Sequence, residues 1–435
     1  MVLLVTGLLA TGCSRSSNSS SKPKSSGATS GDFGTLRGVC GPGNAKTATA
    51  QGVTDSTISV GTMADPGATA RPGLDQELFD SADAFVGWCN AAGGILGRKL
   101  TLHKWDSKLT EVAPRMIEAC SSDFVLVGNG EALDEGGVDQ RLKCGLPEIP
   151  TYDVSKKAGT APLSVQPLPN PDYASGLYGA YAHLKQVDPE AAKHYAMLSS
   201  QFQSVKDAGN KDRAAAEAAG YTTVYYDELP IVIDNWRPYV QNLQNKGVQV
   251  VTVESDPQPI AAMFKAMSDV GYHPKYTIFN PNLYDPTFVA NTGGALQGSV
   301  YISTDFVPFE LASRHPATKQ YRDDLAKYAN GATPKLLGAQ AWSAWLLFAE
   351  SAKACASNLT RTCLLDHARS VPSWTGGGLH APSHPGDANA PAPECFVLVQ
   401  ASPTGFTVDA TVTKPNTDVF NCSSSNVFRL PGFPK

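Results

Sequence analysis

The chain has 435 residues, 42% of them hydrophobic, which is enough for two or three domains with sizeable cores. Its formal net charge is −5 and only 17% of its residues are charged, which excludes the basic surface of a nucleic-acid-binding protein. No apolar run after the N-terminal region is long enough to span a bilayer. The most apolar, residues 339–354, is interrupted by polar residues at helical spacing and is predicted to be a core helix.

The N-terminus predicts export. Residues 1–12 are apolar but too short to span a membrane, so we interpret them as a signal peptide. The stretch LATGC at 9–13 resembles a bacterial lipobox, in which Cys13 would be lipidated. Residues 13–38 are rich in serine and glycine and are predicted to form a lipid-anchored flexible tether. We therefore expect an exported chain anchored to the outer face of the bacterial cytoplasmic membrane. The alternative is a plain signal peptide followed by a spare thiol.

Nine cysteines occur, and setting Cys13 aside leaves eight. None forms a Cys-x-x-Cys pair, so a zinc site is not expected. Disulfides persist in the oxidising environment outside the cytoplasm. Proximity favours the pairs Cys120–Cys144, Cys355–Cys363 and Cys395–Cys422, which leaves Cys40 for Cys89. Free buried thiols are the alternative.

Strand-like and helix-like segments alternate from residue 57 onward. The predicted strands are 57–60, 99–105, 124–127, 195–198, 223–226, 248–253 and 276–279. The predicted helices are 75–92, 110–120, 173–186, 204–219, 235–245 and 259–270. This order is typical of parallel sheets covered by helices on both faces. We predict an α/β fold of two Rossmann-like lobes joined by a hinge near the proline-rich stretch 162–171, with a ligand cleft between the lobes.

The lobes are expected to be discontinuous in sequence. Residues 39–166 plus 304–375 are assigned to the first lobe, and residues 167–303 plus 376–435 to the second. The strand-like segment 300–303 is expected to lead the chain back to the first lobe, where helices at 316–328 and 337–356 would pack.

Two motifs resemble a known family. GVTDSTISVG at 52–61 resembles the opening of type I periplasmic solute-binding proteins, the branched-chain amino acid and amide-binding family that serves ABC importers. NAAGGILGRKL at 90–100 resembles the helix-turn-strand motif of the same family. The resemblance implies two lobes that close on a small ligand, an ABC transporter permease as partner, and no cofactor.

The loops that follow the strands are the expected ligand-binding elements, because ligands of open α/β sheets sit beyond the carboxyl ends of the strands. Arg71 stands among glycines and prolines and suits a carboxylate or carbonyl. Relatives that bind an α-ammonium have a glutamate where this chain has Asn280, and Glu254 is a possible substitute. The candidate ligand-binding residues are Asp65, Arg71, Gln76, Asn129, Gly130, Glu131, Tyr152, Asp153, Ser155, Phe202, Gln203, Glu254, Asn280 and Tyr284.

Enzyme motifs are missing: there is no Gly-x-Ser-x-Gly, no His-Glu-x-x-His and no Walker loop. His380 and His384 have a metal-like spacing but no cysteine or acidic pair beside them, so no metal site is expected. We therefore predict a monomeric receptor that captures a small polar molecule, such as an amino acid, an amide or a small carboxylate, and delivers it to an importer. A sensory receptor for a membrane signalling partner is the alternative, and a secreted enzyme is a third possibility.

Overall fold

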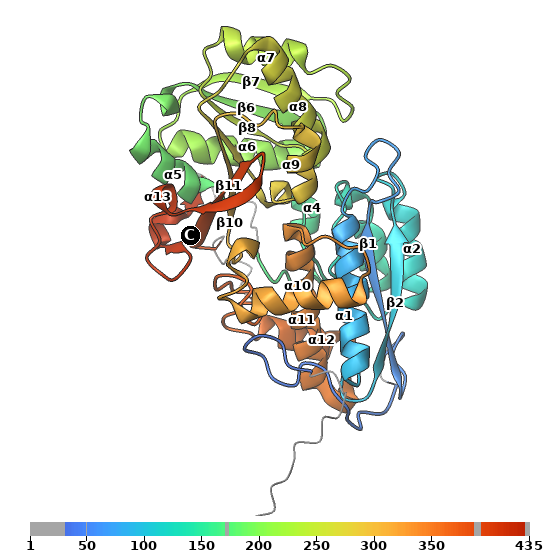
Figure 1. Ribbon diagram of the computed structural model, residues 1–435. Helices are drawn as coiled ribbons and strands as arrows, with labels where there is room; N and C mark the ends of the chain where they lie inside the picture. Colours follow the sequence, from blue (N-terminus) through green and yellow to red (C-terminus); the bar gives the residue numbers. More distant parts are fainter. Residues whose placement is uncertain (1–30, 49, 170–173, 387–392, 431–435) are drawn as a thin grey trace, which may run out of the picture.

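The computed structural model describes residues 31–48, 50–169, 174–386 and 393–430. Two lobes, each built around its own β-sheet, lie one above the other in Figure 1. The predicted signal peptide, Cys13 and the tether up to residue 30 lie outside the described residues. Within the described part of the chain, no helix combines the length and hydrophobicity of a membrane span.

The first lobe contains a parallel sheet of four strands in the order β2-β1-β3-β4. Its strands are β1 (Thr57–Ala64), β2 (Lys99–Asp106), β3 (Val125–Val127) and β4 (Glu148–Ile149). The helices along this stretch are α1 (Gln76–Ala92), α2 (Val112–Ser122), α3 (Val138–Cys144) and α4 (Lys156–Gly159). Parallel strands require such crossovers, and all three residues of β3 are buried, as expected for an interior strand.

Three helices from late in the chain complete this lobe. They are α10 (Pro316–Tyr328), α11 (Leu336–Cys355) and α12 (Arg361–Arg369). The predicted core helix is confirmed as α11, which packs along α1 beside α10 (Figure 1). Its Trp345 ring stacks on Phe85 of α1 with ring centroids 5.4 Å apart. Because α11 is apolar nearly all round, it forms the centre of the lobe instead of its surface.

The second lobe contains the larger sheet, with the strand order β12-β11-β10-β9-β8-β6-β7. Its strands are β6 (Tyr195–Ser200), β7 (Thr223–Leu229), β8 (Val250–Val253), β9 (Tyr276–Phe279), β10 (Ser299–Thr304), β11 (Cys395–Ser402) and β12 (Gly405–Asp409), with the short β13 (Asn421–Cys422) beside β11. A separate pair is formed by β5 (Ala174–Ser175) and β14 (Phe428–Arg429). The helices are α5 (Tyr178–Val187), α6 (Gln203–Ala218), α7 (Arg237–Asn245), α8 (Pro257–Val270), α9 (Pro286–Thr292) and α13 (Ala410–Thr413).

The sequence suggested that segment 300–303 leads the chain back to the first lobe, but this segment stays in the second lobe. It is part of β10, which pairs in parallel with β9 and antiparallel with β11 inside the second sheet. A strand buried on both faces needs hydrogen-bonded neighbours on both edges, and only the second sheet provides them. The chain returns to the first lobe after Thr304. Residues near His380, assigned to the second lobe from sequence, instead contact α11, since His380 Nε2 lies 2.9 Å from Ser343 Oγ.

The end of the predicted tether is also packed. Phe33 is fully buried between Trp88 and Trp342, with ring centroids 6.2 and 5.5 Å away. The Thr35 amide donates a hydrogen bond to the Gly377 carbonyl oxygen at 2.9 Å. The tether prediction for 13–38 is therefore wrong over its last residues. One aromatic side chain in a polar stretch is enough to hold the segment against an aromatic cluster.

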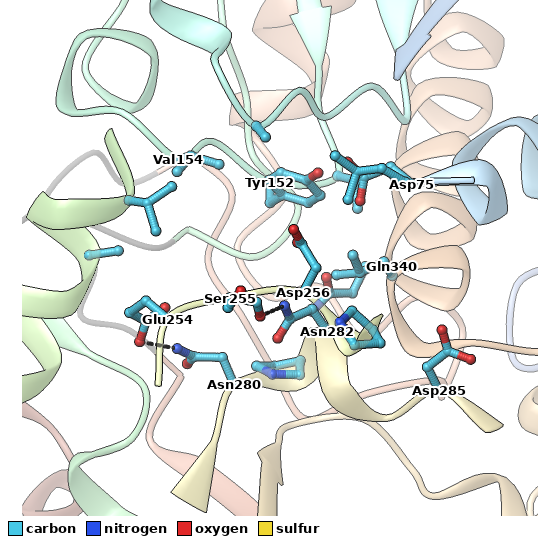
Figure 2. A pocket seen from close by; sticks show the side chains of 18 of the residues that line it. Asp75, Tyr152, Val154, Glu254, Ser255, Asp256, Asn280, Asn282, Asp285 and Gln340 are labelled. Carbon is cyan, nitrogen blue, oxygen red and sulfur yellow. Dashed lines mark hydrogen bonds between the residues drawn. The ribbon is translucent and has the colours of Figure 1, made fainter. Parts of the chain in front are cut away.

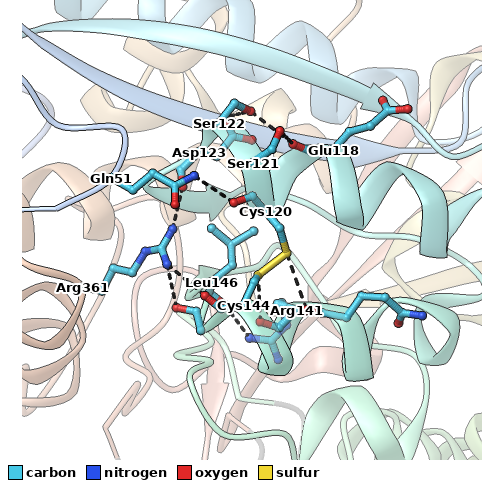
Figure 3. Close-up of a disulfide and its surroundings, with 12 residues drawn as sticks. Gln51, Glu118, Cys120, Ser121, Ser122, Asp123, Arg141, Cys144, Leu146 and Arg361 are labelled. Atoms are coloured by element: carbon cyan, nitrogen blue, oxygen red, sulfur yellow. Dashed lines mark hydrogen bonds between the residues drawn. A yellow bond between two sulfur atoms is a disulfide. The ribbon is translucent and has the colours of Figure 1, made fainter.

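The four expected disulfides are present, so the alternative of free buried thiols does not hold for these eight cysteines. Cys40–Cys89 joins the segment before β1 to α1, and Cys120–Cys144 joins α2 to α3 (Figure 3). Cys355–Cys363 links α11 to α12, and Cys395–Cys422 links β11 to β13. Each bridge ties elements within one lobe, which leaves the lobes free of covalent cross-links between them among the described residues.

Candidate ligand-binding cleft

A cavity of about 450 Å³ lies between the two lobes. Much of its wall is formed by segments that directly follow the carboxyl ends of the strands. The first lobe contributes 151–154 after β4, and the second lobe contributes residues after β6, β7, β8, β9 and β10. Carboxyl ends of parallel strands meet at one edge of a sheet, so both lobes present these loops to the same space.

Six of the fourteen candidate residues line this cavity. From the first lobe come Arg71, Tyr152 and Asp153, and from the second come Phe202, Glu254 and Asn280. The cavity therefore brings together residues from five loops that are far apart in sequence.

On the first-lobe side, Tyr152 is the central side chain (Figure 2). A Cβ at Gly130 would lie 2.7 Å from its ring, so a glycine is needed there for the ring to occupy this place. The Tyr152 hydroxyl interacts with the Asp75 carboxylate. Burial, followed by the charges of Glu77 and Asp256, raises the pKa of Asp75 well above its ordinary value.

On the second-lobe side, Asn280 holds two carboxyl groups. Its Nδ2 donates to Glu254 Oε1 and to Asp212 Oδ2, each at 2.9 Å (Figure 2 draws the first bond). Asp212 Oδ1 also accepts from Ser175 Oγ at 2.6 Å. Burial and the neighbouring Asp212 raise the pKa of Glu254 well above its ordinary value, because a second negative charge at this site is unfavourable.

Carboxyl groups dominate the wall of the cavity. The eight acidic residues that line it are Asp75, Glu77, Asp153, Asp212, Glu254, Asp256, Asp285 and Asp305. The three basic ones are Arg71, Lys211 and Lys335. Burial raises the pKa of Asp305 to about 7, because the charged form of this carboxyl group is disfavoured away from water.

Contacts also cross the cleft. Arg71 of the first lobe pairs with Asp256 of the second and donates to the Ile231 carbonyl oxygen. Lys335, at the start of α11, lies 3.0 Å from Asp285 and 3.4 Å from Glu77. These contacts join the two lobes around the cavity.

Eight candidates do not line the cavity, and local hydrogen bonding accounts for most of them. The carboxylate of Asp65 accepts from Ser107, Leu109 and Ala132 and so shapes the loop after β1. Ser155 caps α4 by accepting from the Ala158 amide at 3.1 Å. Such turn and cap bonds explain why polar residues follow the strands without reaching a ligand.

The other candidates outside the lining have partners elsewhere. The amide side chains of Gln76 and Gln203 donate to Asp80 and Asp207, each one helical turn ahead. Asn129 Nδ2 lies 3.4 Å from Glu148 Oε2, and Glu131 is buried. Gly130 acts through Tyr152, as described above. Tyr284 packs its ring on Phe309 and Phe406 and accepts from the Phe309 amide.

Several lining residues had not been predicted. Asp305 directly follows β10, and the loop after this strand-like segment was not counted among the ligand-binding loops. Asp212 is a carboxylate on the buried face of α6, a recognisable signal. Lys335 and Gln340 come from the start of α11, where nothing in the local sequence indicates a cleft.

Within the described residues, one group of side chains lies close enough together to hold a metal ion: Cys355, Cys363 and His367. The two sulfurs form a disulfide and so offer no thiolate to a metal ion. His380 and His384 bond to different neighbours: His380 to Ser343, and His384 Nδ1 to the Pro372 carbonyl oxygen at 2.7 Å.

The comparison with protein families matches this geometry to a known class. The model of the family described as periplasmic binding protein matches residues 57–405, which is most of the chain. The chain belongs to the periplasmic binding protein family. The fold and the family resemblance expected from the two motifs are thereby confirmed.

Solved structures share the two-lobed fold of this protein, although their sequences are only 12–15% identical to it. A fatty acid ABC transporter substrate-binding protein from Thermomonospora curvata is 15% identical, with 88% of this chain and 97% of that one covered and a TM-score of 0.73. A leucine-binding protein from Thermotoga maritima is 12% identical, with coverage of 81% and 97% and a TM-score of 0.67. A solute-binding protein from Rhodopseudomonas palustris in complex with 3,4-dihydroxybenzoic acid is 14% identical, with coverage of 86% and 97% and a TM-score of 0.64. The comparison with curated proteins finds no match.

The matched family is one of binding proteins, not enzymes, so the chain is a periplasmic binding protein.

Proposed function

We propose that this protein is a lipid-anchored receptor that captures a small polar molecule between its two lobes and delivers it to an ABC importer. The observation that carries the proposal is the cavity of about 450 Å³, lined by strand-end loops of both lobes. Cavities of 300–1,000 Å³ suit small molecules. Closure of the lobes would enclose the ligand by hinge motion.

The structural neighbours support transport over sensing, because two of them are named as components of ABC transporters. The ligands in the names of these neighbours differ widely, from leucine to a fatty acid and a dihydroxybenzoic acid. The loops that line the cavity, and not the fold, must therefore determine which ligand binds here.

Ligand capture is tested by thermal unfolding of the protein with a panel of small amines, amino acids, amides and carboxylates. A ligand that binds only the folded state stabilises that state and so raises the midpoint of unfolding. At a hundred times its Kd, such a ligand adds about 2.7 kcal/mol to the free energy of unfolding. Mass spectrometry of small molecules that co-purify with the protein is the complementary measurement. If no compound of any charge class shifts the midpoint and none co-purifies, the proposal is contradicted.

The anchor is tested separately. Cys13→Ala should release a folded, ligand-competent protein into the medium, whereas the unaltered chain should partition with membranes. The matched control is Ser14→Ala, which leaves the cysteine in place. A Cys13→Ala protein that stays in the membrane fraction would place the anchor elsewhere.

A further inference from the structure

The cleft has an unusual charge balance for a site that binds amino acids or carboxylic acids. Eight carboxyl side chains line it, against three basic ones. Arg71 is engaged by Asp256 and the Ile231 carbonyl, and Lys335 lies between Asp285 and Glu77. Lys211 lies in the field of Glu254. A carboxylate ligand would therefore have to displace carboxylates that already occupy these cations.

Two carboxyl groups of the cavity wall, one from each lobe, have few hydrogen-bond donors around them. Asp75 of the first lobe is 7% exposed, and its Oδ2 has no hydrogen-bond partner among the described residues. Glu254 of the second lobe shares a single amide donor, Asn280 Nδ2, with Asp212. A buried carboxylate without enough donors is costly, so both positions favour a ligand that brings N–H donors and positive charge.

Like charges also face each other across the cleft. Asp256 of the second lobe acts electrostatically on Asp75 of the first. Closing the lobes brings such groups together in a region of low dielectric, where repulsion is stronger than in water. Arg71 already offsets part of this repulsion at Asp256, and a ligand cation beside Asp75 would reduce the rest, so it would favour the closed state.

The remainder of the wall is suited to a hydrocarbon. Phe202, Leu229 and Phe396 line the cavity together with Leu74, Leu133 and Leu337. These side chains can cover the carbon skeleton of a small molecule while the carboxyl groups bind its polar ends.

We propose that the cleft binds an organic cation, an amine or guanidine without a free carboxylate, whose N–H groups bond to Asp75 and to Glu254. This inference rests on the proposed receptor function and narrows its ligand class. It distinguishes this site from one built for zwitterionic amino acids, because every basic side chain that could hold a ligand carboxylate already has an acidic neighbour.

The test compares ligands that differ in one group. Thermal unfolding and calorimetric titration of the full chain would use cadaverine against lysine, and agmatine against arginine, each pair differing only by the carboxylate. Glutarate, the dicarboxylate with the same number of carbons as cadaverine, serves as the anion. At least one amine is expected to bind about tenfold or more tightly than its amino-acid counterpart, and glutarate is expected not to bind.

Variants at Glu254 and Asp75 test whether the amine binds at these two carboxyl groups. Glu254→Gln and Asp75→Asn should each weaken amine binding by about tenfold or more, because each removes a charged hydrogen-bond acceptor. Asp324→Asn, on α10 outside the cavity, is the matched control and should leave amine affinity unchanged. The ligand pairs are measured on the unaltered chain, so their result does not depend on whether the variants fold.

The outcomes separate the two proposals. Binding of lysine, arginine or glutarate in preference to the amines would overturn the cation inference and leave the receptor function standing. Absence of binding by these amines would overturn the cation inference, and the receptor function would fall as well only if the full panel gave no shift and no small molecule co-purified. Amine binding that is equally strong in Glu254→Gln and Asp75→Asn would also overturn the inference, since the cation would then lie elsewhere.

Discussion

Arg71 of the first lobe reaches across the cleft to Asp256 of the second, with 3.4 Å between Nε and Oδ2. The same guanidinium donates to the Ile231 carbonyl oxygen, which follows β7. Arg71 thus contacts two separate loops of the opposite lobe. A single side chain that bridges the lobes beside the cavity is expected to stabilise their closed arrangement.

Replacing Arg71 should favour the open arrangement of the lobes. Arg71→Ala is expected to cost the closed state about 1 kcal/mol, roughly a fivefold loss of ligand affinity, since Asp256 is partly exposed to solvent. Titration with the compound that stabilises the protein most would measure the affinity, and small-angle scattering would show a larger radius of gyration. Arg115→Ala is the control, because Arg115 pairs with Glu111 and Glu118 around α2, within the first lobe. Equal affinities in both variants would show that Arg71 does not hold the lobes together.

The buried His380 should make stability depend on pH. Burial lowers the pKa of His380 from 6.5 to about 4. Its Nδ1 donates to the Ala381 carbonyl at 2.7 Å, so the neutral ring accepts from Ser343 through Nε2. The unfolded chain takes up a proton at the ordinary pKa, whereas the folded chain does not until about pH 4. Stability should therefore fall between about pH 6.5 and 4, by up to about 3 kcal/mol.

Chemical denaturation at several pH values would measure this fall. His380→Gln should be less stable at neutral pH but should lose less stability on acidification than the unaltered protein. His384→Gln, at an exposed histidine, should retain the full pH dependence. If His380→Gln and the unaltered protein lost the same stability on acidification, other groups would be responsible.

Phe33 should stabilise the first lobe, although it lies in a serine- and glycine-rich stretch. Its ring is fully buried against Trp88 and Trp342, so Phe33→Ala should cost about 3–5 kcal/mol of unfolding free energy. Thermal unfolding would measure the change. Thr35→Ala, at an exposed neighbour, should change stability by less than about 0.5 kcal/mol. Equal midpoints for the two variants would mean that the segment does not pack on the lobe in solution.

Arg361 on α12 should be important for the disulfide-linked corner of the first lobe (Figure 3). Its guanidinium donates to the carbonyl oxygens of Asp123, Phe124, Cys144 and Gly145, at 2.8 to 3.2 Å. Arg361→Met keeps the apolar stem but leaves these carbonyls without their donor, which should cost about 2–3 kcal/mol. Denaturant unfolding would measure the loss. Arg369→Met, at an exposed position of the same helix, is the control, and a similar loss there would contradict the role of these bonds.

The strand-end loops show how far local sequence can identify a site. Tyr152, Glu254 and Asn280 were predicted because they follow strands, and the cavity brings them together. Asp65 and Ser155 also follow strands, but they complete turns and helix caps within their own lobe. Sequence identifies the loop, whereas the direction of each side chain depends on the packing around it.

The sequence by itself determined the alternation of strands and helices, the two-lobed α/β class and the pairing of the eight cysteines, because these depend on local periodicity and on chain separation. Only the tertiary structure decided that β10 pairs with β9 and β11, that Phe33 is buried, and that Asp75, Asp212 and Lys335 line the cleft. Those features arise where segments distant in sequence pack together. Their contribution to the free energy of folding depends on burial and on neighbouring charges, which a local sequence pattern does not reveal.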